Sequence, residues 1–286
     1  MKRRPELLES SSVSDITRSK AFFEELVEFH WAYYSELAFQ RNRIREQLRD
    51  ALRGEAEAFA FASWQRTIKY QYSLNPLSTK GSLTDPGGRF NIGRIDPTRY
   101  PVFSALYIAS DKETALAETL GGNSGTGGLS PAELALTRPD SVTIVSVSGK
   151  LESVLDIRKT KSISSFVDLV RSFRLSESLM FKARKLSFPV ELIKSTSTLS
   201  KVLRQRNWRE WPMHFDVPAT CQIFGSLVMT AGIESILYDS SITAKPCLAV
   251  FPPNFSNSSS YVEIDDNPPR KDVKRRMDAT NFGNFL

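Results

Sequence analysis

Two blocks of strand-like sequence, separated by a long helical stretch, constrain the fold of this 286-residue chain more than any other feature. Between the blocks, residues 163–210 have a helical and basic character, and Pro189 is a predicted helix boundary. The absence of strict alternation between strands and helices favours an α+β fold over a doubly wound sheet. The strand-like segments are residues 64–70, 102–109, 142–148, 154–157, 235–238 and 247–251.

The regions that flank these blocks differ in composition and predict three parts. Residues 1–62 are expected to form an N-terminal helical extension, because aromatic and aliphatic residues recur there at spacings of three and four, with the helical pattern running from Asp15 to Ala62. Residues 63–254 are expected to form the main domain, and residues 255–286 a basic, polar tail that is irregular until its last aromatic residues. The N-terminal helices could pack on the main domain, form a dimer contact or dock a partner.

The composition argues against several classes of protein. Two cysteines and two histidines are too few for a disulfide framework, a four-ligand zinc site or a His-rich metal centre. No segment approaches the roughly 18 consecutive apolar residues of a membrane helix, and no apolar run follows the basic start as in a secretory signal. We therefore expect a cytoplasmic protein without a structural metal.

The net charge of +6 raises the possibility of a nucleic-acid partner. The positive residues are spread along the chain and cluster only modestly, at 41–53 and 270–276. A solvated helix face and a basic tail account for these clusters, and an anionic small molecule or an acidic protein would fit equally well. The charge alone does not identify a ligand, and a nucleic-acid partner is not expected from it.

A glycine-dense turn at residues 85–93 carries the first candidate for chemistry. Adjacent glycines allow backbone N–H groups to approach an anion closely, and Arg89 adds a charged fork that suits a carboxylate or a phosphate. By itself the turn also fits an ordinary loop with an exposed arginine. A second Gly-rich segment, 123–130, lacks the Lys-Ser/Thr pair of a P-loop and is interpreted as a connection.

That turn is part of a series of short motifs in a fixed order, and the series resembles the RES domain family, named for its arginine, glutamate and serine. The match extends from about residue 64 to residue 252. The N-terminal helices lie outside it, the section around residues 160–210 is longer than usual, and Ser240 is followed by Ser241, so that the serine is ambiguous by one position. The motifs are Trp64-Gln-Arg66-Thr, Gly87-Gly-Arg89-Phe-Asn91, Leu106-Tyr107, Ala115-Leu-Ala-Glu118, Ala219-Thr-Cys-Gln222, Gly232-Ile-Glu-Ser-Ile-Leu-Tyr238-Asp-Ser240 and Cys247-Leu-Ala-Val-Phe-Pro.

The resemblance implies an ADP-ribosyltransferase-like fold and a bacterial toxin that consumes NAD+. The main domain, 63–254, would then be the NAD-binding catalytic domain, with NAD+ as substrate and no metal. Cleavage of the nicotinamide–ribose bond, as a glycohydrolase or a phosphorylase, is the expected reaction. A protein ADP-ribosyltransferase with a specific target is the first alternative, and a non-catalytic module that binds nucleic acid or a partner is the second. An Xre-like antitoxin is the implied protein partner, and the N-terminal helices are candidates for a contact in a homo-oligomer.

The same resemblance implies roles for individual residues. Glu118 lies on a predicted helix at 111–120 and would stabilise the positive charge that develops on the ribose. Arg66 and Arg89 would hold the phosphates. Tyr107 would stack on the nicotinamide or hydrogen-bond the ribose. Ser240 would contact the ribose or support Glu118 by a hydrogen bond. The helix is expected to be capped by Ser110 or Asp111 and to stop at Gly121-Gly122. Asn91 and Gln222 complete the set as polar candidates of lower rank.

Overall fold

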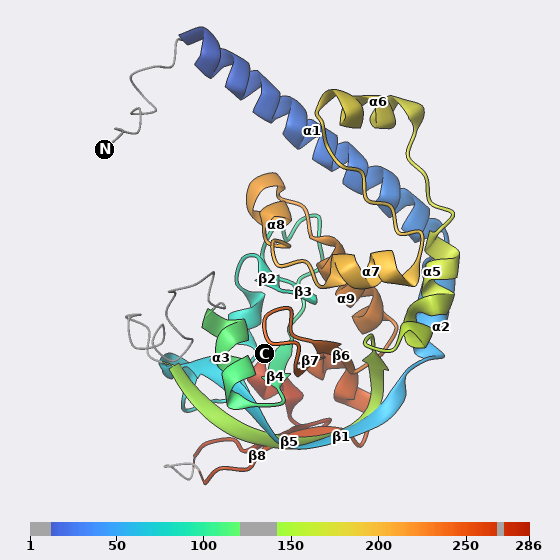
Figure 1. The fold of residues 1–286 in the computed structure, drawn as a ribbon. Coiled ribbons are helices and arrows are strands. Elements are labelled where there is room, and N and C mark those ends of the chain that lie inside the picture. The colour runs from blue at the N-terminus through green and yellow to red at the C-terminus, as the bar shows by residue number, and fades with distance from the viewer. Residues whose placement is uncertain (1–12, 121–141, 268–271) are drawn as a thin grey trace. The chain divides into compact units, whose positions relative to one another are not determined.

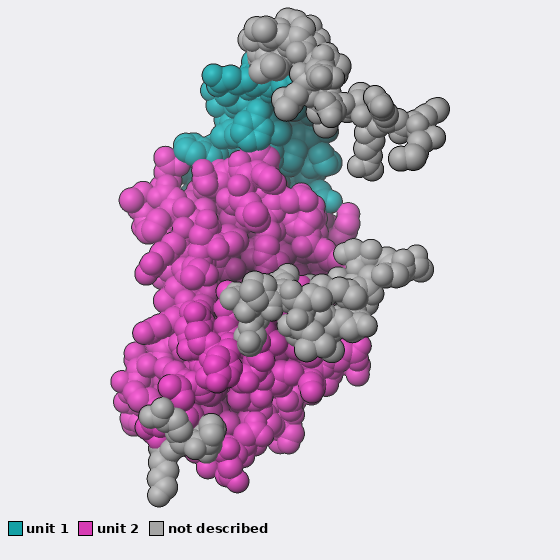
Figure 2. Space-filling view, turned by 90° about the vertical axis from the view of Figure 1, so that its left-hand side faces the viewer, with its two compact units in different colours: residues 1–43, 173–192 teal, residues 44–172, 193–286 magenta. Residues whose placement is uncertain are grey.

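The computed structural model describes residues 13–120, 142–267 and 272–286, with side chains from residue 19 onward, and confirms the mixed α+β class. The expected Gly-rich connection 123–130 and the helix stop at Gly121-Gly122 lie outside these residues. The chain divides into two compact units, coloured separately in Figure 2: residues 1–43 with 173–192, and residues 44–172 with 193–286. These boundaries differ from the expected 1–62, 63–254 and 255–286 division, which stays a prediction. No helix in the described part of the chain is long and apolar enough to cross a membrane.

The first unit consists of the long helix α1 (Val13–Arg43) and the short helix α6 (Glu177–Lys185). The ring of Phe29 is fully buried and lies 5.0 Å from the ring of Phe188, centroid to centroid. An ion pair of 2.7 Å joins Lys185 to Glu25. Part of the aromatic pattern of the N-terminal region is thus explained by packing within this unit.

The second unit is built on a seven-stranded sheet with the order β1-β4-β7-β6-β5-β8-β9. An additional pairing of β1 with β5 closes the first five strands into a ring, and the two long strands run side by side in Figure 1. Among the strands that the structure describes, β5 and β6 are the one pair that runs parallel. The core inside the ring is apolar, with Leu106, Leu151 and Leu248 fully buried. The strands are β1 (Glu57–Lys69), β4 (Leu106–Ala109), β5 (Val142–Asp156), β6 (Ser235–Asp239), β7 (Pro246–Val250), β8 (Tyr261–Ile264) and β9 (Arg276–Asp278).

Strand β1 corrects the expectation that helix continues to Ala62, because the strand already begins at Glu57. The local sequence alternates alanine and phenylalanine, so that Phe59 and Phe61 lie on one face and pack with Trp64 against the core. An irregularity in the pairing with β5 between Phe61 and Trp64 includes Ser63, whose φ is 57°. Good helix formers thus occupy a strand because its partner strand buries the alternate side chains.

Strand β5 replaces the two separate strands expected at 142–148 and 154–157. The Gly149-Lys150 pair, which lies between the two expected segments, is inside the strand, with β1 on one side and β8 on the other. A side chain at Gly149 would come within 2.5 Å of the Tyr261 carbonyl oxygen and 2.8 Å of the Phe61 ring. Here glycine permits a close approach of neighbouring strands and does not mark a turn.

The C-terminal residues are another correction, since most of the expected irregular tail is part of the fold. Strands β8 and β9 extend the sheet, and Val262 and Met277 are fully buried. The side chain of Phe285 is also fully buried, and its carbonyl oxygen accepts hydrogen bonds from the amide and hydroxyl of Thr79. Apolar residues spaced by two in a polar sequence therefore form an outer pair of strands.

Helices of the second unit account for most of the long central segment. Helices α5 and α7 lie in the expected helical stretch 163–210, α8 begins at its last residue, and Pro189 precedes α7 as predicted. Helix α9 carries the Ala219-Thr-Cys-Gln222 motif at its start, and Gly232 follows the helix with a φ of 82°. Short 3-10 helices cover residues 70–72, 80–83, 160–163, 252–257 and 282–285. The bounds of the helices are α2 (Arg45–Arg53), α3 (Lys112–Leu120), α5 (Ser164–Val170), α7 (Thr196–Leu203), α8 (Glu210–Phe215) and α9 (Thr220–Thr230).

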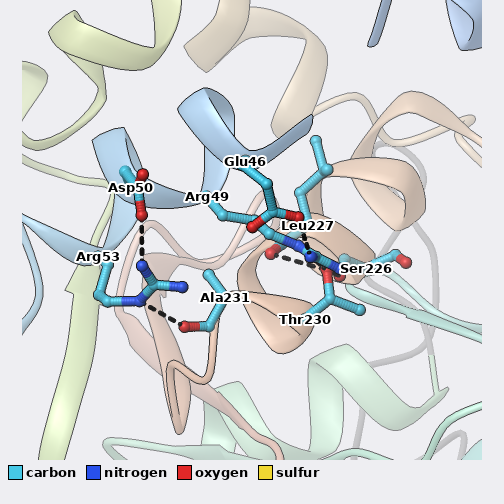
Figure 3. A network of polar contacts seen from close by, with 8 residues as sticks. All are labelled: Glu46, Arg49, Asp50, Arg53, Ser226, Leu227, Thr230 and Ala231. Atoms are coloured by element: carbon cyan, nitrogen blue, oxygen red, sulfur yellow. Dashed lines mark hydrogen bonds and ion pairs between the residues drawn. The ribbon is translucent and has the colours of Figure 1, made fainter. Parts of the chain in front are cut away.

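Helix α2 holds the C-terminal end of α9 through two arginines, as Figure 3 shows. The Arg53 Nε donates to the Ala231 carbonyl oxygen at 3.0 Å, and the Arg49 Nε donates to the Thr230 hydroxyl at 3.2 Å. Each guanidinium also pairs with an acidic residue one turn earlier on α2, Asp50 or Glu46. Cations at a helix C-terminus offset the partial negative charge there, so this contact anchors the far end of the helix whose first turn supports the site.

Candidate active site

A pocket of about 740 Å³ lies in the second unit and gathers most of the predicted site residues. Its wall comes from β1, the 78–89 segment, β4, α3, the 204–209 connection between α7 and α8, and the β6–β7 turn. Glu118 is the single carboxylate among the lining residues. The cationic residues of the lining are Arg66, Lys69, Arg89, Arg206 and Arg209. This excess of positive charge suits an anionic ligand.

The glycine turn at the pocket wall is held from behind by two amide side chains. Gly87–Gly88 (β2) and Asn91–Ile92 (β3) pair as a small hairpin. The fully buried Asn91 donates to the Ser82 and Phe103 carbonyl oxygens at 2.7 and 3.0 Å, and its Oδ1 accepts from the Gly88 amide at 2.9 Å.

Gln222, in the first turn of α9, is fully buried as well and fixes the same turn. Its Nε2 faces the carbonyl oxygens of Pro86, Gly88 and Asn91 at 2.7, 3.2 and 3.1 Å, and its Oε1 accepts from the Ala219 amide. Neither Asn91 nor Gln222 lines the pocket. Their polar atoms are used within the protein, where they hold the turn that forms this part of the pocket wall.

Tyr107 on β4 presents its ring to the pocket, while its hydroxyl is engaged on the protein side. The hydroxyl donates to Asn91 Oδ1 at 2.9 Å and accepts from the Phe90 amide at 3.0 Å. Burial raises the pKa of Tyr107 well above its usual value, so the phenol stays neutral. Of the two expected roles, stacking on a ring therefore fits the geometry better than a hydrogen bond to ribose.

Arg66 on β1 is bound to backbone carbonyl oxygens. Its guanidinium donates to Pro76, Ser78 and Tyr107 at 2.9, 2.7 and 2.9 Å. Burial lowers the pKa of Arg66 to about 10. The charge has no carboxylate partner among the described residues. Arg66 thus organises the 76–78 segment and leaves two of its five N–H donors, together with its charge, for a ligand.

Arg89 follows the glycine turn and is 8 % exposed. Its Nη1 donates to the carbonyl oxygens of Leu203 and Gln205 at 3.2 and 2.8 Å, and its Nη2 donates to the Ser241 hydroxyl at 3.0 Å. No ion pair of Arg89 occurs within the described ranges. Like Arg66, it is a partly desolvated cation held by neutral oxygens beside the pocket.

Glu118 lies near the end of α3, which begins where Asp111 caps it. The Asp111 carboxylate accepts from the Thr114 amide at 2.9 Å and from its hydroxyl at 3.1 Å, so of the two expected caps it is Asp111 that binds the helix. The Thr114 hydroxyl also contacts the Thr243 hydroxyl at 2.9 Å, which ties α3 to the β6–β7 turn. This link fixes the helix that carries the carboxylate relative to the serine opposite.

Ser240 donates its hydroxyl proton to Glu118 Oε1 at 2.5 Å. The Ser240 Oγ also accepts from the amides of Ile242 and Thr243, and the side chain is buried. Ser241 instead faces the pocket and binds Arg89. The two adjacent serines therefore have different partners: Ser240 orients the Glu118 carboxylate, and Ser241 orients the Arg89 guanidinium.

Arg206, Trp208 and Arg209 also line the pocket, and none of them was a predicted site residue. They follow α7, in the section that is longer than the family pattern. The Arg209 guanidinium lies over the Trp208 ring, 4.5 Å from its centroid. The pattern Arg-Asn-Trp-Arg was a weak signal, because isolated arginines are equally dense elsewhere in this basic chain.

Together these groups can bind an anion beside a carboxylate and a flat aromatic face. The carboxylate is held by a short hydrogen bond and can stabilise positive charge that develops on a bound ligand. Within the described residues, no group of three or more His, Cys, Asp and Glu side chains is placed to hold a metal ion. The arrangement supports electrostatic stabilisation of a cationic transition state next to a bound phosphate.

Comparisons with known proteins place the chain in a family. A search of curated proteins finds no match. Among solved structures, a chain of the crystal structure of the M. tuberculosis MbcT–MbcA toxin–antitoxin complex is similar, with a TM-score of 0.43 and 11% sequence identity, over 84% of this chain and 97% of that chain. The family model of the RES domain matches residues 63–269, most of the chain. The protein therefore belongs to the RES domain family.

Proposed function

We propose that the protein binds NAD+ and breaks its nicotinamide–ribose bond. The observation that carries this proposal is the Glu118 carboxylate, fixed by Ser240 at 2.5 Å beside a pocket rich in arginine. Membership of the RES family supports it, because the family resemblance implies NAD+ as the substrate. The pocket volume of about 740 Å³ falls within the usual range for small-molecule and cofactor sites.

The chemistry needs stabilisation of a cation more than it needs a strong base. When the bond from ribose C1′ to the nicotinamide nitrogen breaks, its electron pair goes to that nitrogen, and neutral nicotinamide leaves. The ribose then carries positive charge shared between C1′ and the ring oxygen. A carboxylate next to this ring lowers the energy of the transition state more than that of the ground state, and so increases the rate. Glu118 supplies this charge in the proposal.

An acceptor oxygen then bonds to C1′, and its proton passes to Glu118 or to solvent. If the acceptor is water, the product is ADP-ribose. If it is phosphate, the product is ADP-ribose phosphorylated at the C1′ that carried nicotinamide. A protein side chain as acceptor would give an ADP-ribosylated target. Tyr107 would stack on the nicotinamide, and Arg66 and Arg89 would attract the phosphates through the N–H donors that the protein leaves unused.

The experiment that tests this proposal follows NAD+, nicotinamide and ADP-ribose by chromatography for the wild type and for Glu118→Gln and Arg66→Ala. We expect rapid loss of NAD+ in the wild type and loss of activity in both variants. Glu113→Gln is the matched control, since Glu113 lies on the same helix but is exposed and outside the pocket. Intact NAD+ after incubation with folded wild-type protein, phosphate and cell lysate would refute the proposal.

The same assay separates the alternatives. Labelled NAD+ that ends up on protein, with little ADP-ribose released, would establish an ADP-ribosyltransferase. Salt-sensitive nucleic-acid binding that survives Glu118→Gln, without any NAD+ turnover, would favour a non-catalytic module. The Glu118–Ser240 contact supports the enzymatic reaction, because a carboxylate in this pocket would repel the phosphates of a nucleic acid but would stabilise a cation that develops on the ribose.

The biological setting of this proposal is a bacterial toxin that acts on cytoplasmic NAD+ and is neutralised by an Xre-like antitoxin. The RES family match supports the setting. Coexpression of the chain with a candidate antitoxin, with cell growth and NAD+ content as the readouts, tests it. Homo-oligomerisation through the N-terminal helices is a separate proposal, which light scattering of the full chain and of a variant without residues 1–43 would examine.

A further inference from the structure

The 204–209 connection brings two arginines to the pocket that the family motifs do not include. Arg206 donates its Nε to the Ser241 carbonyl oxygen at 3.0 Å, so this connection is attached to the β6–β7 turn. Arg209 follows Trp208, which is 3 % exposed and supports the guanidinium with its ring. The connection therefore has a rigid attachment and a supported cation at its end.

The hydrogen bonds of the arginines in the pocket differ in a way that assigns them different tasks. Arg66 and Arg89 each commit three N–H donors to protein oxygens, whereas the Arg209 guanidinium makes no hydrogen bond or ion pair with the described side chains and backbone. All five of its donors remain for a ligand. A ring under a guanidinium restrains its plane without using these donors, which prepares it to bind a planar or forked anion.

The electrostatic surroundings of Arg209 also require an anion. Partial burial and then the positive charge of Arg89 lower its pKa, while Glu118 opposes this effect. Two guanidinium groups that repel one another next to the same pocket cost free energy in the empty protein. A ligand with two adjacent negative charges removes that cost and gains from both.

We propose that Arg209 and Arg89 form a clamp for a pyrophosphate, which makes the pocket selective for dinucleotides and nucleoside diphosphates over mononucleotides. This inference rests on the proposed NAD+ activity for its biological meaning, but the clamp itself is a property of the arginines. A pyrophosphate carries two phosphoryl charges, one for each guanidinium, while a mononucleotide offers a single phosphate group. Trp208 keeps Arg209 in place, so the connection acts as the outer half of the clamp.

The test uses binding in the Glu118→Gln background, so that turnover does not interfere. Isothermal titration measures the affinity of this parent for ADP, AMP and adenosine. We expect Arg209→Ala to weaken ADP binding roughly 10- to 100-fold, the loss expected for a charge-assisted contact, and to change adenosine binding less than about twofold. Arg209→Lys should recover part of the loss, because it restores the charge but not the fork. In the catalytically intact protein, Arg209→Ala should raise KM for NAD+ by a similar factor with little change in kcat.

Arg204→Ala is the matched control, because Arg204 belongs to the same connection, pairs with Asp239 at 3.7 Å and does not line the pocket. This variant should bind ADP like the parent, and a thermal melt of each variant confirms folding. Equal affinity of the Arg209→Ala variant and the parent for ADP would overturn the clamp, and so would a parent that does not bind ADP at all. If ADP binding depends on Arg209 while the wild type leaves NAD+ intact, the result supports the proposed clamp and refutes the proposed NAD+ cleavage.

Discussion

Gly88 offers the sharpest test of how the glycine turn and Tyr107 form one wall of the pocket. In Gly88→Ala the new Cβ would lie 2.4 Å from the Tyr107 hydroxyl oxygen and 2.5 Å from two ring carbons. Real side chains do not tolerate such distances, so either the ring or the turn must move. The ring is held by hydrogen bonds to Asn91 and Phe90, and the turn is held by Asn91 and Gln222.

The expected loss of stability follows from the contacts that Gly88→Ala would disrupt. Overpacking of a filled site costs about 1–3 kcal/mol. Movement of the Tyr107 ring would also weaken its two hydrogen bonds, each worth about 0.5–1.5 kcal/mol. We therefore expect Gly88→Ala to lower the free energy of unfolding by about 2–5 kcal/mol and to impair NAD+ binding, because the displaced ring forms part of the wall.

The assay is denaturant unfolding together with NAD+ titration in the Glu118→Gln background, with Gly81→Ala as the control. Gly81 also lines the pocket, but a Cβ there would lie 3.8 Å from the nearest ring atom of Tyr72. Removal of the ring in Tyr107→Ala should make the Gly88 substitution much less costly, since the two changes affect one contact. Wild-type stability and affinity of Gly88→Ala, or an equal cost in the Tyr107→Ala background, would refute this reasoning.

Three further predictions follow from single contacts. Ser240→Ala should lower kcat for NAD+ roughly 10- to 100-fold with little change in KM, because Glu118 loses its donor, whereas Ser241→Ala should mainly raise KM; the opposite pattern in steady-state kinetics would reverse the two roles. Phe285→Ala should lower the free energy of unfolding by about 3–5 kcal/mol in a denaturant titration, and a change below about 1 kcal/mol would mean that the C-terminus is not part of the core. Burial raises the pKa of Asp111, but the hydrogen bonds from the Thr114 amide and hydroxyl outweigh this, and the net pKa is lowered. Its stabilisation is therefore complete above the unfolded value of 3.8 and is lost as the pH falls through the lower folded value, so Asp111→Ala should cost about 1 kcal/mol near neutral pH and little in strong acid.

The sequence by itself determined the family, the α+β class and the order of the site motifs, because these depend on local patterns. Helix α3 with its Asp111 cap and helix α9 before Gly232 follow from capping residues and periodicity. The motifs also identified the residues that the pocket brings together, with Glu118, Arg66, Arg89 and Tyr107 in its lining. Local sequence carries this information since each motif lies within one element or turn.

Only the tertiary structure decided which of those residues line the pocket. Asn91 and Gln222 occur in motifs that suggest binding residues. The side-chain amide of each donates hydrogen bonds to backbone carbonyl oxygens in or near the glycine turn, and no local sequence pattern reveals these contacts. Arg209 has no motif and gains its place because a distant connection meets the β6–β7 turn. The long β5 strand and the outer strands β8 and β9 were missed for the same reason. Strand pairing and burial depend on contacts between residues far apart in the chain, and these contacts override local propensity.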